Sequence, residues 1–594
     1  MSFGLNVEPV GPAHDTRPER LAEAAMFRSM KAFSTKPREM VFAALLLLHM
    51  VPLWGFDYFP SQDGLSHLYN ATIIRNYTRE EFAVYREFYT LQHTFGVNWL
   101  IHLVLAGLME LVPILTAEKI LLTGYALLFM LSLRYAVLSV NDSSLAIAFL
   151  GFPLIYNRSL HMGFYSFIFG LAMFLFCIGH WVRRNRDIGC NRALVSFVVI
   201  SLLLYLTHII SLIMAIAVIG IMTAWLVILE SLEIAVSSSN PPSFDWQHLW
   251  LLLKPRLWST VAFVPSILLV SLFLHDKHAG LSVLEDLKIG FRQLLSFQRT
   301  EAAVMGALLA TLMLLSILNL NERAARFRLE RSDGFLLVAA FVFFVYILAP
   351  DVLFGGALIR ERLLLYVILL SILWVAGQTY GHVLSRLIAG VASAIAISGL
   401  VVNLPQYKNF NEYFHEYVSA GEFIDPHTNL LPVSFTYYWP SHDVDWFTST
   451  APNPLVHVSG YIAAAKTLID LGNYEAATGH FPTVFRPQLN PYKYLGTKED
   501  PLKLNIEGYQ DQVGKHVDYV LLMSTRSIEQ ELRHASDLYR QLNAAYRLIY
   551  TSPRDFARLY RRSDYKASPR FGIHKEDTII FAQRAKNSTG GRDP

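Results

Sequence analysis

Eleven apolar stretches recur along the first two thirds of the chain, and they restrict its fold more than any other feature of the sequence. A helix needs roughly 20 apolar residues to cross a bilayer, and fewer where flanking residues reach for the interface. The candidate spans are residues 40–56, 97–114, 119–138, 161–182, 193–207, 209–230, 257–274, 302–318, 334–349, 362–376 and 383–403. The sequence therefore predicts a mainly α, polytopic membrane protein of about 11 transmembrane helices.

A twelfth apolar stretch, residues 145–156, is shorter than a spanning helix and contains Gly151 and Pro153. We interpret it as a partial or interfacial segment. Positively charged residues favour the cytoplasmic side of a membrane protein, and arginine clusters occur in the N-terminal tail, at 183–186 and at 323–331. All three share one side if the twelfth stretch does not cross. That arrangement predicts a cytoplasmic N-terminus and an extracytoplasmic C-terminal domain.

The density of charged residues changes near residue 403. Residues 403–594 hold 21 Lys+Arg and 21 Asp+Glu, whereas the first 402 residues hold 29 and 26. The C-terminal part has the charge density of a soluble domain. We therefore divide the chain into a cytoplasmic tail (1–39), a transmembrane domain with a first outer loop at 57–96 (40–403), an extracytoplasmic domain (404–583) and a disordered polar tail (584–594).

The extracytoplasmic segment alternates between two local patterns. Runs of branched and aromatic residues predict strands, and stretches with helical spacing of apolar residues predict helices. The predicted strands are 430–438, 519–523, 546–551 and 557–560, and the predicted helices are 460–471 and 527–545. Together they predict a small mixed α/β domain. Cys177 and Cys190 both lie outside it, so no disulfide framework holds it together.

The first outer loop carries the strongest candidate for chemistry. Leu65, Leu68 and Ile73 recur at helical spacing, which predicts an amphipathic helix on the bilayer surface. Asp63 precedes this helix and His67 lies one turn later on the same face. Asp63 is either an N-cap or a general base that takes a proton from an acceptor hydroxyl beside the membrane. His67 either orients that carboxylate, contacts a phosphate or is a polar rim residue.

Five further polar residues lie at predicted outer ends of spans. Arginine matches phosphate geometry and keeps its charge, so Arg158, Arg360 and Arg362 are candidates for holding a phosphate leaving group. His161 follows Arg158 at the mouth of a span, and His208 divides a long apolar stretch. The alternatives are anchoring at the interface for arginine and a simple turn between spans for His208.

Other polar residues receive no role from the sequence alone. His102, Glu110 and Arg134 lie within the second and third predicted spans, where charged residues mark interior or functional positions. In the C-terminal domain, residues 473–475 (Asn-Tyr-Glu) and 481–482 (Phe-Pro) form a candidate lid over the membrane site.

Several of these segments resemble a known family. Residues 62–70, Gln-Asp-Gly-Leu-Ser-His-Leu-Tyr-Asn, are similar to the Asp-Gly-x-x-His-Leu-Tyr signature of bacterial members of the GT-C superfamily of integral membrane glycosyltransferases. Residues 157–176 resemble their Gly-Phe-x-x-Phe-x-x-Gly segment, and residues 206–208 are a further match. The resemblance covers roughly residues 40–400.

The resemblance implies an inverting sugar transfer at the outer face of the bacterial inner membrane. It implies a polyprenyl-phosphate-linked sugar as donor, a glycan, lipid or protein acceptor, and Asp63 as the base. Asp63 is followed by Gly64, so the sequence lacks the paired acidic residues of metal-binding members. We therefore predict no cofactor; a divalent metal stays an alternative that no motif supports.

Other classes of function remain open or are excluded. A lipid or glycan transporter is one alternative, and a polysaccharide polymerase or ligase that does not use Asp63 is another. Binding to nucleic acid is not expected, because the net charge is only +3 and the chain has no long basic run.

Overall fold

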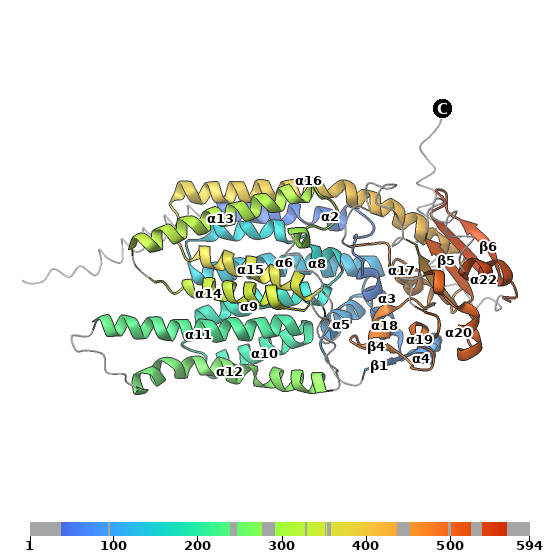
Figure 1. Cartoon of the computed structure of the whole chain (residues 1–594), viewed down its shortest axis with the longest axis horizontal. Coiled ribbons are helices and arrows are strands. Elements are labelled where there is room, and N and C mark those ends of the chain that lie inside the picture. Colours follow the sequence, from blue (N-terminus) through green and yellow to red (C-terminus); the bar gives the residue numbers. More distant parts are fainter. Residues whose placement is uncertain are drawn as a thin grey trace, which may run out of the picture.

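The computed structural model describes residues 37–92, 96–237, 246–275, 291–326, 329–350, 352, 358–435, 452–496, 501–523 and 537–566. The predicted tails at 1–39 and 584–594 lie outside these residues, apart from 37–39. The described chain forms a long helix bundle with a smaller α/β domain at one end (Figure 1). We call this end of the bundle the domain end and the opposite end the far end.

Seven described helices are long and apolar enough to cross a membrane. They are Pro37–Trp54, α6 (Ile114–Val140), α9 (Tyr165–Arg184), α11 (Ile209–Ser237), α12 (Trp246–His275), α13 (Glu301–Arg326) and α16 (His382–Val418). Large apolar side chains such as Leu47, Leu272 and Val401 are 71%, 69% and 63% exposed, which suits contact with lipid rather than water. The protein is thus a mainly helical, multi-pass membrane protein.

Three further helices of the bundle coincide with predicted spans but are shorter or more charged. They are α10 (Asn191–Thr207), α14 (Asp333–Leu348) and α15 (Ile359–Ala376). The last predicted span, 383–403, forms the first part of α16, which continues through Pro405 to Val418 and leads into the C-terminal domain.

Residues 97–114, predicted as the second span, do not form a spanning helix. They form α5 (Trp99–Leu108), only ten residues long. The Trp54 side chain at the domain end hydrogen-bonds Thr123 near the start of α6, whereas Glu39 at the far end pairs with Arg134. The helix Pro37–Trp54 therefore ends where α6 begins, and the chain between them, including α5, stays at the domain end. Trp99, Ile101, Leu105 and Ala106 on one face of α5 are buried against protein, whereas Leu103 and Val104 are exposed.

The stretch 145–156 also differs from the prediction. It forms the short helices α7 (Leu145–Ala148) and η2 (Phe149–Leu154) inside the bundle. Ser144, just before it, hydrogen-bonds Gln378 after the C-terminal end of α15, and Arg158, just after it, pairs with Glu361 at the start of α15. The segment therefore runs from the far end to the domain end. Irregular backbone is tolerated at such depth where protein surrounds it.

The first outer loop folds against both parts of the molecule. It contains α3 (Gly64–Asn76), η1 (Glu80–Phe82), α4 (Ala83–Phe88) and β1 (Tyr89–Leu91). The predicted helix is present, but it does not lie on a bilayer surface: both its apolar and its polar faces are buried, between α5 and α17 (Ser459–Lys466). Polar residues such as Ser66 and Asn70 are buried too, and Asn473 of the C-terminal domain supplies a partner for Asn70.

The C-terminal domain contains a five-stranded mixed sheet in the order β3-β2-β5-β7-β6. Its strands are β2 (Asn429–Ser434), β3 (Ile469–Asp470), β5 (Tyr519–Met523), β6 (Tyr546–Thr551) and β7 (Ala557–Arg562). β2 is parallel to β3 and β5, whereas β7 is antiparallel to β5 and β6. The C-terminal part of the chain thus contains a small sheet region, where the sequence predicted a small α/β domain.

Shorter elements complete the domain and its connection to the bundle. They are η4 (Ser419–Phe423), α18 (Tyr474–Thr478), β4 (Thr483–Phe485), α19 (Pro491–Tyr494), η6 (Pro501–Lys503), α20 (Ile506–Val513) and α22 (Asp537–Ala545), with α2 (Val51–Trp54), α8 (Arg158–His161) and η3 (Phe291–Leu294) in the bundle. β4 pairs antiparallel with β1. The first outer loop and the C-terminal segment therefore share a sheet.

Candidate active site

The loop that carries Asp63 is held by the segment before α9. The backbone amide of Gln62 donates to the His161 carbonyl oxygen (2.8 Å), and the amide of Asp63 donates to the Met162 carbonyl oxygen (3.2 Å). Gly163 has φ +80°, and a Cβ there would lie 2.6 Å from the Asp63 amide nitrogen. Only glycine allows this approach. Two predicted outer segments thus meet at Asp63.

The Asp63 side chain is buried and does not cap α3. It is 6% exposed, and although Asp63 occupies the N-cap position, no hydrogen bond runs from its carboxylate to the helix amides. Instead its Oδ1 lies 3.4 Å from Gln62 Nε2 and 3.5 Å from His457 Nε2, and Tyr474 also bonds the carboxylate. The prediction that Asp63 is merely an N-cap is therefore wrong.

Burial shifts the protonation of this carboxylate. Desolvation raises the pKa of Asp63 to about 6, although the charge of His67 and the hydrogen bond from Tyr474 act in the opposite direction. A carboxylate with such a pKa is ionised at neutral pH and is a stronger base than an exposed aspartate.

A second buried carboxylate, Glu118, contacts the loop before α3 through Tyr165. The Tyr165 hydroxyl donates to Glu118 Oε1 (2.6 Å) and lies 2.8 Å from Ser61 Oγ. A Cβ on Gly64 would lie 2.0 Å from Ser61 Oγ, so Ser61, Tyr165 and Glu118 pack directly against the start of α3. Glu118 carries no sequence motif, and sequence reasoning missed it.

Arg362 and His208 form a pair beside this loop. Arg362 Nη1 lies 3.2 Å from His208 Nε2, and the guanidinium lies over the Phe164 ring, 4.4 Å from its centroid. Arg362 forms no ion pair within the described chain, and its buried Nε has no hydrogen-bond partner there. Its charge interacts with that of the neighbouring Glu361 and, more weakly, with that of Asp63. The structure therefore brings together three of the predicted site residues.

The other two predicted arginines are engaged by protein groups. Arg158 Nε donates to Glu361 Oε2 (2.9 Å) in a pair whose side chains are 11% and 10% exposed. Arg360 is 8% exposed and donates from Nε to the Ala349 carbonyl oxygen (2.7 Å). Arg158 thus pairs with a carboxylate at the start of α15, and Arg360 is bonded through Nε to a backbone carbonyl there.

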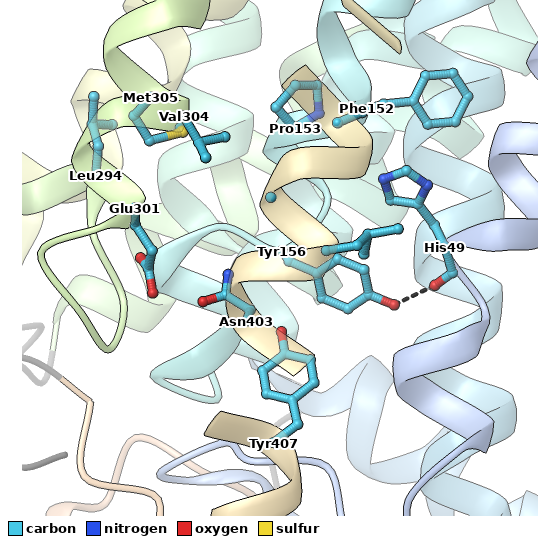
Figure 2. A pocket seen from close by; sticks show the side chains of 13 residues that line it. His49, Phe152, Pro153, Tyr156, Leu294, Glu301, Val304, Met305, Asn403 and Tyr407 are labelled. Carbon is cyan, nitrogen blue, oxygen red and sulfur yellow. Dashed lines mark hydrogen bonds between the residues drawn. The ribbon is translucent and has the colours of Figure 1, made fainter. Parts of the chain in front are cut away.

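His161 faces away from Asp63. Its Nδ1 lies 2.7 Å from Ser296 Oγ and its Nε2 2.6 Å from the Tyr407 hydroxyl, so both ring nitrogens are occupied. Tyr407 lines a cavity of about 40 Å³ between η2, α13 and α16. Figure 2 shows His49, Tyr156, Glu301 and Tyr407 around it. A space of this size holds one or a few water molecules, and it does not include Asp63.

His67 belongs to a cluster that no sequence motif predicts. Its Nδ1 lies 2.9 Å from Glu475 Oε1 and 3.3 Å from His102 Nε2, and the latter nitrogen lies 2.9 Å from Glu475 Oε2. Burial raises the pKa of Glu475, but the two histidines outweigh this effect and hold the pKa of that carboxyl well below its usual range. Phe481 packs on both imidazoles, with centroid separations of 5.9 and 5.8 Å.

The segment predicted as a lid lies directly on the first outer loop. Asn473 and Asn70 exchange two amide hydrogen bonds of 2.9 and 3.0 Å. Tyr474 reaches Asp63, and its ring stacks on His457 with a centroid separation of 4.6 Å. Sequence reasoning placed Tyr474 only in a candidate lid and gave no role to His457 or His102, because each reaches the site through the packing of distant segments.

Comparisons with known proteins add little to this geometry. No protein-family model matches the chain, and none of the curated proteins matches it. Among solved structures, the chain is similar to the crystal structure of the Archaeoglobus fulgidus oligosaccharyltransferase in complex with zinc and sulfate, with a TM-score of 0.40 and 12% sequence identity over 88% of this chain and 73% of that one. At this level of likeness, function has to be inferred from the residues around Asp63, where the bundle meets the C-terminal domain.

Proposed function

We propose that the protein is a membrane glycosyltransferase that moves a sugar from a polyprenyl-phosphate donor to an acceptor hydroxyl at the domain end of the bundle. One observation carries the proposal: a buried carboxylate, Asp63, lies within electrostatic reach of an arginine, Arg362, that has no carboxylate partner in the described chain. A base and an unpaired cation are the two groups that sugar transfer from a phosphate requires.

The proposed step assigns one task to each group. Asp63 takes the proton of the acceptor hydroxyl, whose oxygen forms a bond to the anomeric carbon of the sugar. The bond between that carbon and the phosphate oxygen breaks, and the polyprenyl phosphate leaves with the electron pair. Arg362 and His208 stabilise the negative charge that grows on the leaving phosphate. Attack opposite the leaving group inverts the anomeric configuration.

The surroundings of Asp63 support a role in proton transfer. Tyr474 and His457 border the carboxylate from the C-terminal domain, and the backbone of 161–162 fixes it from the bundle. The acceptor therefore approaches between the two parts of the molecule. In the cell this end of the bundle faces the outside of the bacterial inner membrane, because we place the basic N-terminal tail in the cytoplasm.

The test uses the full chain in detergent with synthetic undecaprenyl-phosphate-linked hexoses and pentoses as donors. Wild-type protein is expected to bind one of them and to release undecaprenyl phosphate when a membrane glycan extract supplies the acceptor. Asp63→Asn should bind the same donor but release product 10²–10⁴-fold more slowly, the usual contribution of a general base.

Arg75→Gln is the matched control, since Arg75 lies on α3, the helix that follows Asp63, but is partly exposed and paired with Glu110. It should leave both binding and release unchanged. Full product release by Asp63→Asn would overturn the assignment of the base. Transport of the lipid across vesicles without release of undecaprenyl phosphate would favour a transporter instead.

A further inference from the structure

Three side chains from distant parts of the sequence converge in one buried spot behind Asp63. His67 comes from α3, His102 from α5 and Glu475 from α18, and they are 3%, 0% and 0% exposed. One ligand atom from each lies within 4.8 Å of the other two. A carboxylate at such depth is costly unless a cation accompanies it.

Backbone carbonyl oxygens fix the tautomer of both histidines. In each ring we call the nitrogen that faces Glu475 the inner nitrogen and the other one the outer nitrogen. His67 Nε2 lies 2.8 Å from the Gly163 carbonyl oxygen, and His102 Nδ1 lies 3.0 Å from the Asn98 carbonyl oxygen. A carbonyl oxygen only accepts, so both outer nitrogens are donors. In neutral rings, the inner nitrogens then direct lone pairs toward Glu475. Histidine ligands of metal ions make this same outer hydrogen bond.

The spacing of the inner atoms suits a shared ion. With bonds of about 2.0–2.1 Å and angles between 90° and the tetrahedral value, neighbouring ligand atoms lie about 2.9–3.4 Å apart. The two inner nitrogens lie 3.3 Å apart, and each lies 2.9 Å from a different oxygen of Glu475: His67 Nδ1 from Oε1, and His102 Nε2 from Oε2. One oxygen of Glu475 and the two nitrogens lie within 4.8 Å of one another. Glu475 Oε1 is buried and makes no hydrogen bond of acceptable geometry in the described chain, despite its nearness to His67. An ion would satisfy this oxygen.

We propose that His67, His102 and Glu475 bind one divalent transition-metal ion, for which Zn²⁺ is the best match. Two imidazoles and a carboxylate are ligands that zinc accepts, whereas Mg²⁺ and Ca²⁺ prefer oxygen ligands alone. Three protein ligands leave one tetrahedral position for a water molecule. The proposal does not rest on the glycosyltransferase function, and Asp63 is not one of the ligands.

The ion would join the first outer loop, α5 and the C-terminal domain. The first outer loop and the C-terminal domain are already joined by the β1–β4 pairing, and the ion would add a second link between them. Phe481 of the C-terminal domain covers the two ligand rings. Metal binding to the folded chain alone adds directly to its stability. The ion thereby fixes the helix that begins next to Asp63.

The experiment measures the metal in the full chain, purified in detergent without chelator. Elemental analysis should find one zinc ion per chain, and X-ray absorption at the zinc edge should show nitrogen and oxygen neighbours near 2.0 Å. After removal of zinc, Co²⁺ alone should produce the visible absorption bands of a tetrahedral site. The wild-type measurements decide the proposal even if a variant fails to fold.

Variants then assign the ligands. His67→Gln, His102→Gln and Glu475→Gln should each bind Co²⁺ at least 100-fold more weakly, since loss of a single outer hydrogen bond to a ligand already costs about 10–100-fold. His457→Gln, in the same junction but outside the cluster, should retain the ion. A charge network of protonated histidines with no metal predicts no zinc, no Co²⁺ bands and a melting temperature indifferent to added zinc, and that result would overturn the proposal. Full retention of metal by all three ligand variants would overturn it as well.

Discussion

The amide of Asp63 donates a hydrogen bond of 3.2 Å to the carbonyl oxygen of Met162, two residues whose segments lie about a hundred positions apart in the chain. Through this bond and its neighbour from Gln62, the backbone before α9 sets the position of the candidate base. Gly163 follows Met162 and has the conformation that lets the two backbones touch.

Substitution of Gly163 tests this contact. In Gly163→Ala, the new Cβ would lie 2.6 Å from the Asp63 nitrogen at a φ of +80°, so the loop has to move. We expect a loss of about 1–3 kcal/mol in the free energy of unfolding and a fall in transfer rate of about 100-fold, the usual effect of a misplacement near 1 Å. Gly390→Ala, in α16 with open space around it, is the control and should be neutral or slightly stabilising. Unchanged activity in Gly163→Ala would show that the contact does not position Asp63.

The pH dependence of transfer should follow the Asp63 carboxyl. Its pKa of about 6 lies above the ordinary value of 3.8, and only the ionised form accepts a proton. We therefore expect the rate to fall as the pH drops through about 6, rather than below 4. The measurement is a pH profile of undecaprenyl phosphate release at limiting donor. An acid limb near 4 would mean that Asp63 is not buried in the active state.

The same shift predicts the effect of Asp63 on stability. Because its pKa is higher in the folded chain than in the unfolded chain, the folded state binds more protons between pH 4 and 6, and stability falls as the pH rises through this interval. Above it, the full cost is about 3 kcal/mol for about two pKa units. Asp63→Asn should therefore melt at a higher temperature than wild type at pH 8, with a smaller difference at pH 5. A variant that is less stable at both pH values would indicate a structural role for the carboxylate.

Replacement of Arg362 should weaken donor binding and slow transfer together. Its Nε has no partner, and its neighbours are His208 and the Phe164 ring. Arg362→Gln is expected to cost about 10²–10³-fold in rate, and Arg362→Lys should recover part of it, because charge returns without the fork of donors. Arg158→Gln should instead lower the melting temperature, since it leaves the buried carboxylate of Glu361 without this partner. Equal donor binding by wild type and Arg362→Gln would exclude contact with the phosphate.

The reciprocal pair Asn70 and Asn473 measures how strongly the C-terminal domain holds the first outer loop. Each side chain donates to the other, and both are buried. Either single alanine variant leaves unpaired amide atoms and should cost about 1–3 kcal/mol. The double variant should cost less than the sum of the two, as judged by chemical unfolding in detergent. Strict additivity would show that the two amides do not interact in solution.

Local patterns predicted much of the fold correctly. The strands at 519–523 and 546–551 have the predicted bounds, and α3 begins directly after Asp63 as expected. In each case the residues within the segment carry the signal, because alternation or helical spacing describes how one element meets its neighbours. Arg362 at the start of α15 and His208 between α10 and α11 were both candidate site residues from the sequence, and the two side chains are in contact in the structure.

Hydropathy failed for two short apolar segments whose course is set by packing within the protein. Residues 97–114 and 145–156 are both apolar, yet α5 stays at the domain end while the shorter stretch runs between the two ends of the bundle. Apolar composition records the loss of contact with water, and it does not distinguish lipid from a protein interior. One predicted span, 97–114, does not cross, whereas the stretch 145–156 does. The number of crossings is therefore unchanged, and the three arginine clusters still lie on the same side of the membrane.

The sequence by itself determined the multi-pass helical character of this chain, its small α/β domain and the place of Asp63 before a helix, because these depend on composition and on spacing within one segment. Only the tertiary structure decided which residues surround that carboxylate. Tyr474, His457, His102 and Glu475 lie from 35 to about 400 positions away from the first outer loop's Asp63 and His67. Three of them arrive because the C-terminal domain packs on the polar face of α3, and His102 arrives on α5, which packs against the same helix. Burial of that face raises the pKa of Asp63 and gathers the cluster around His67, and no local pattern encodes it.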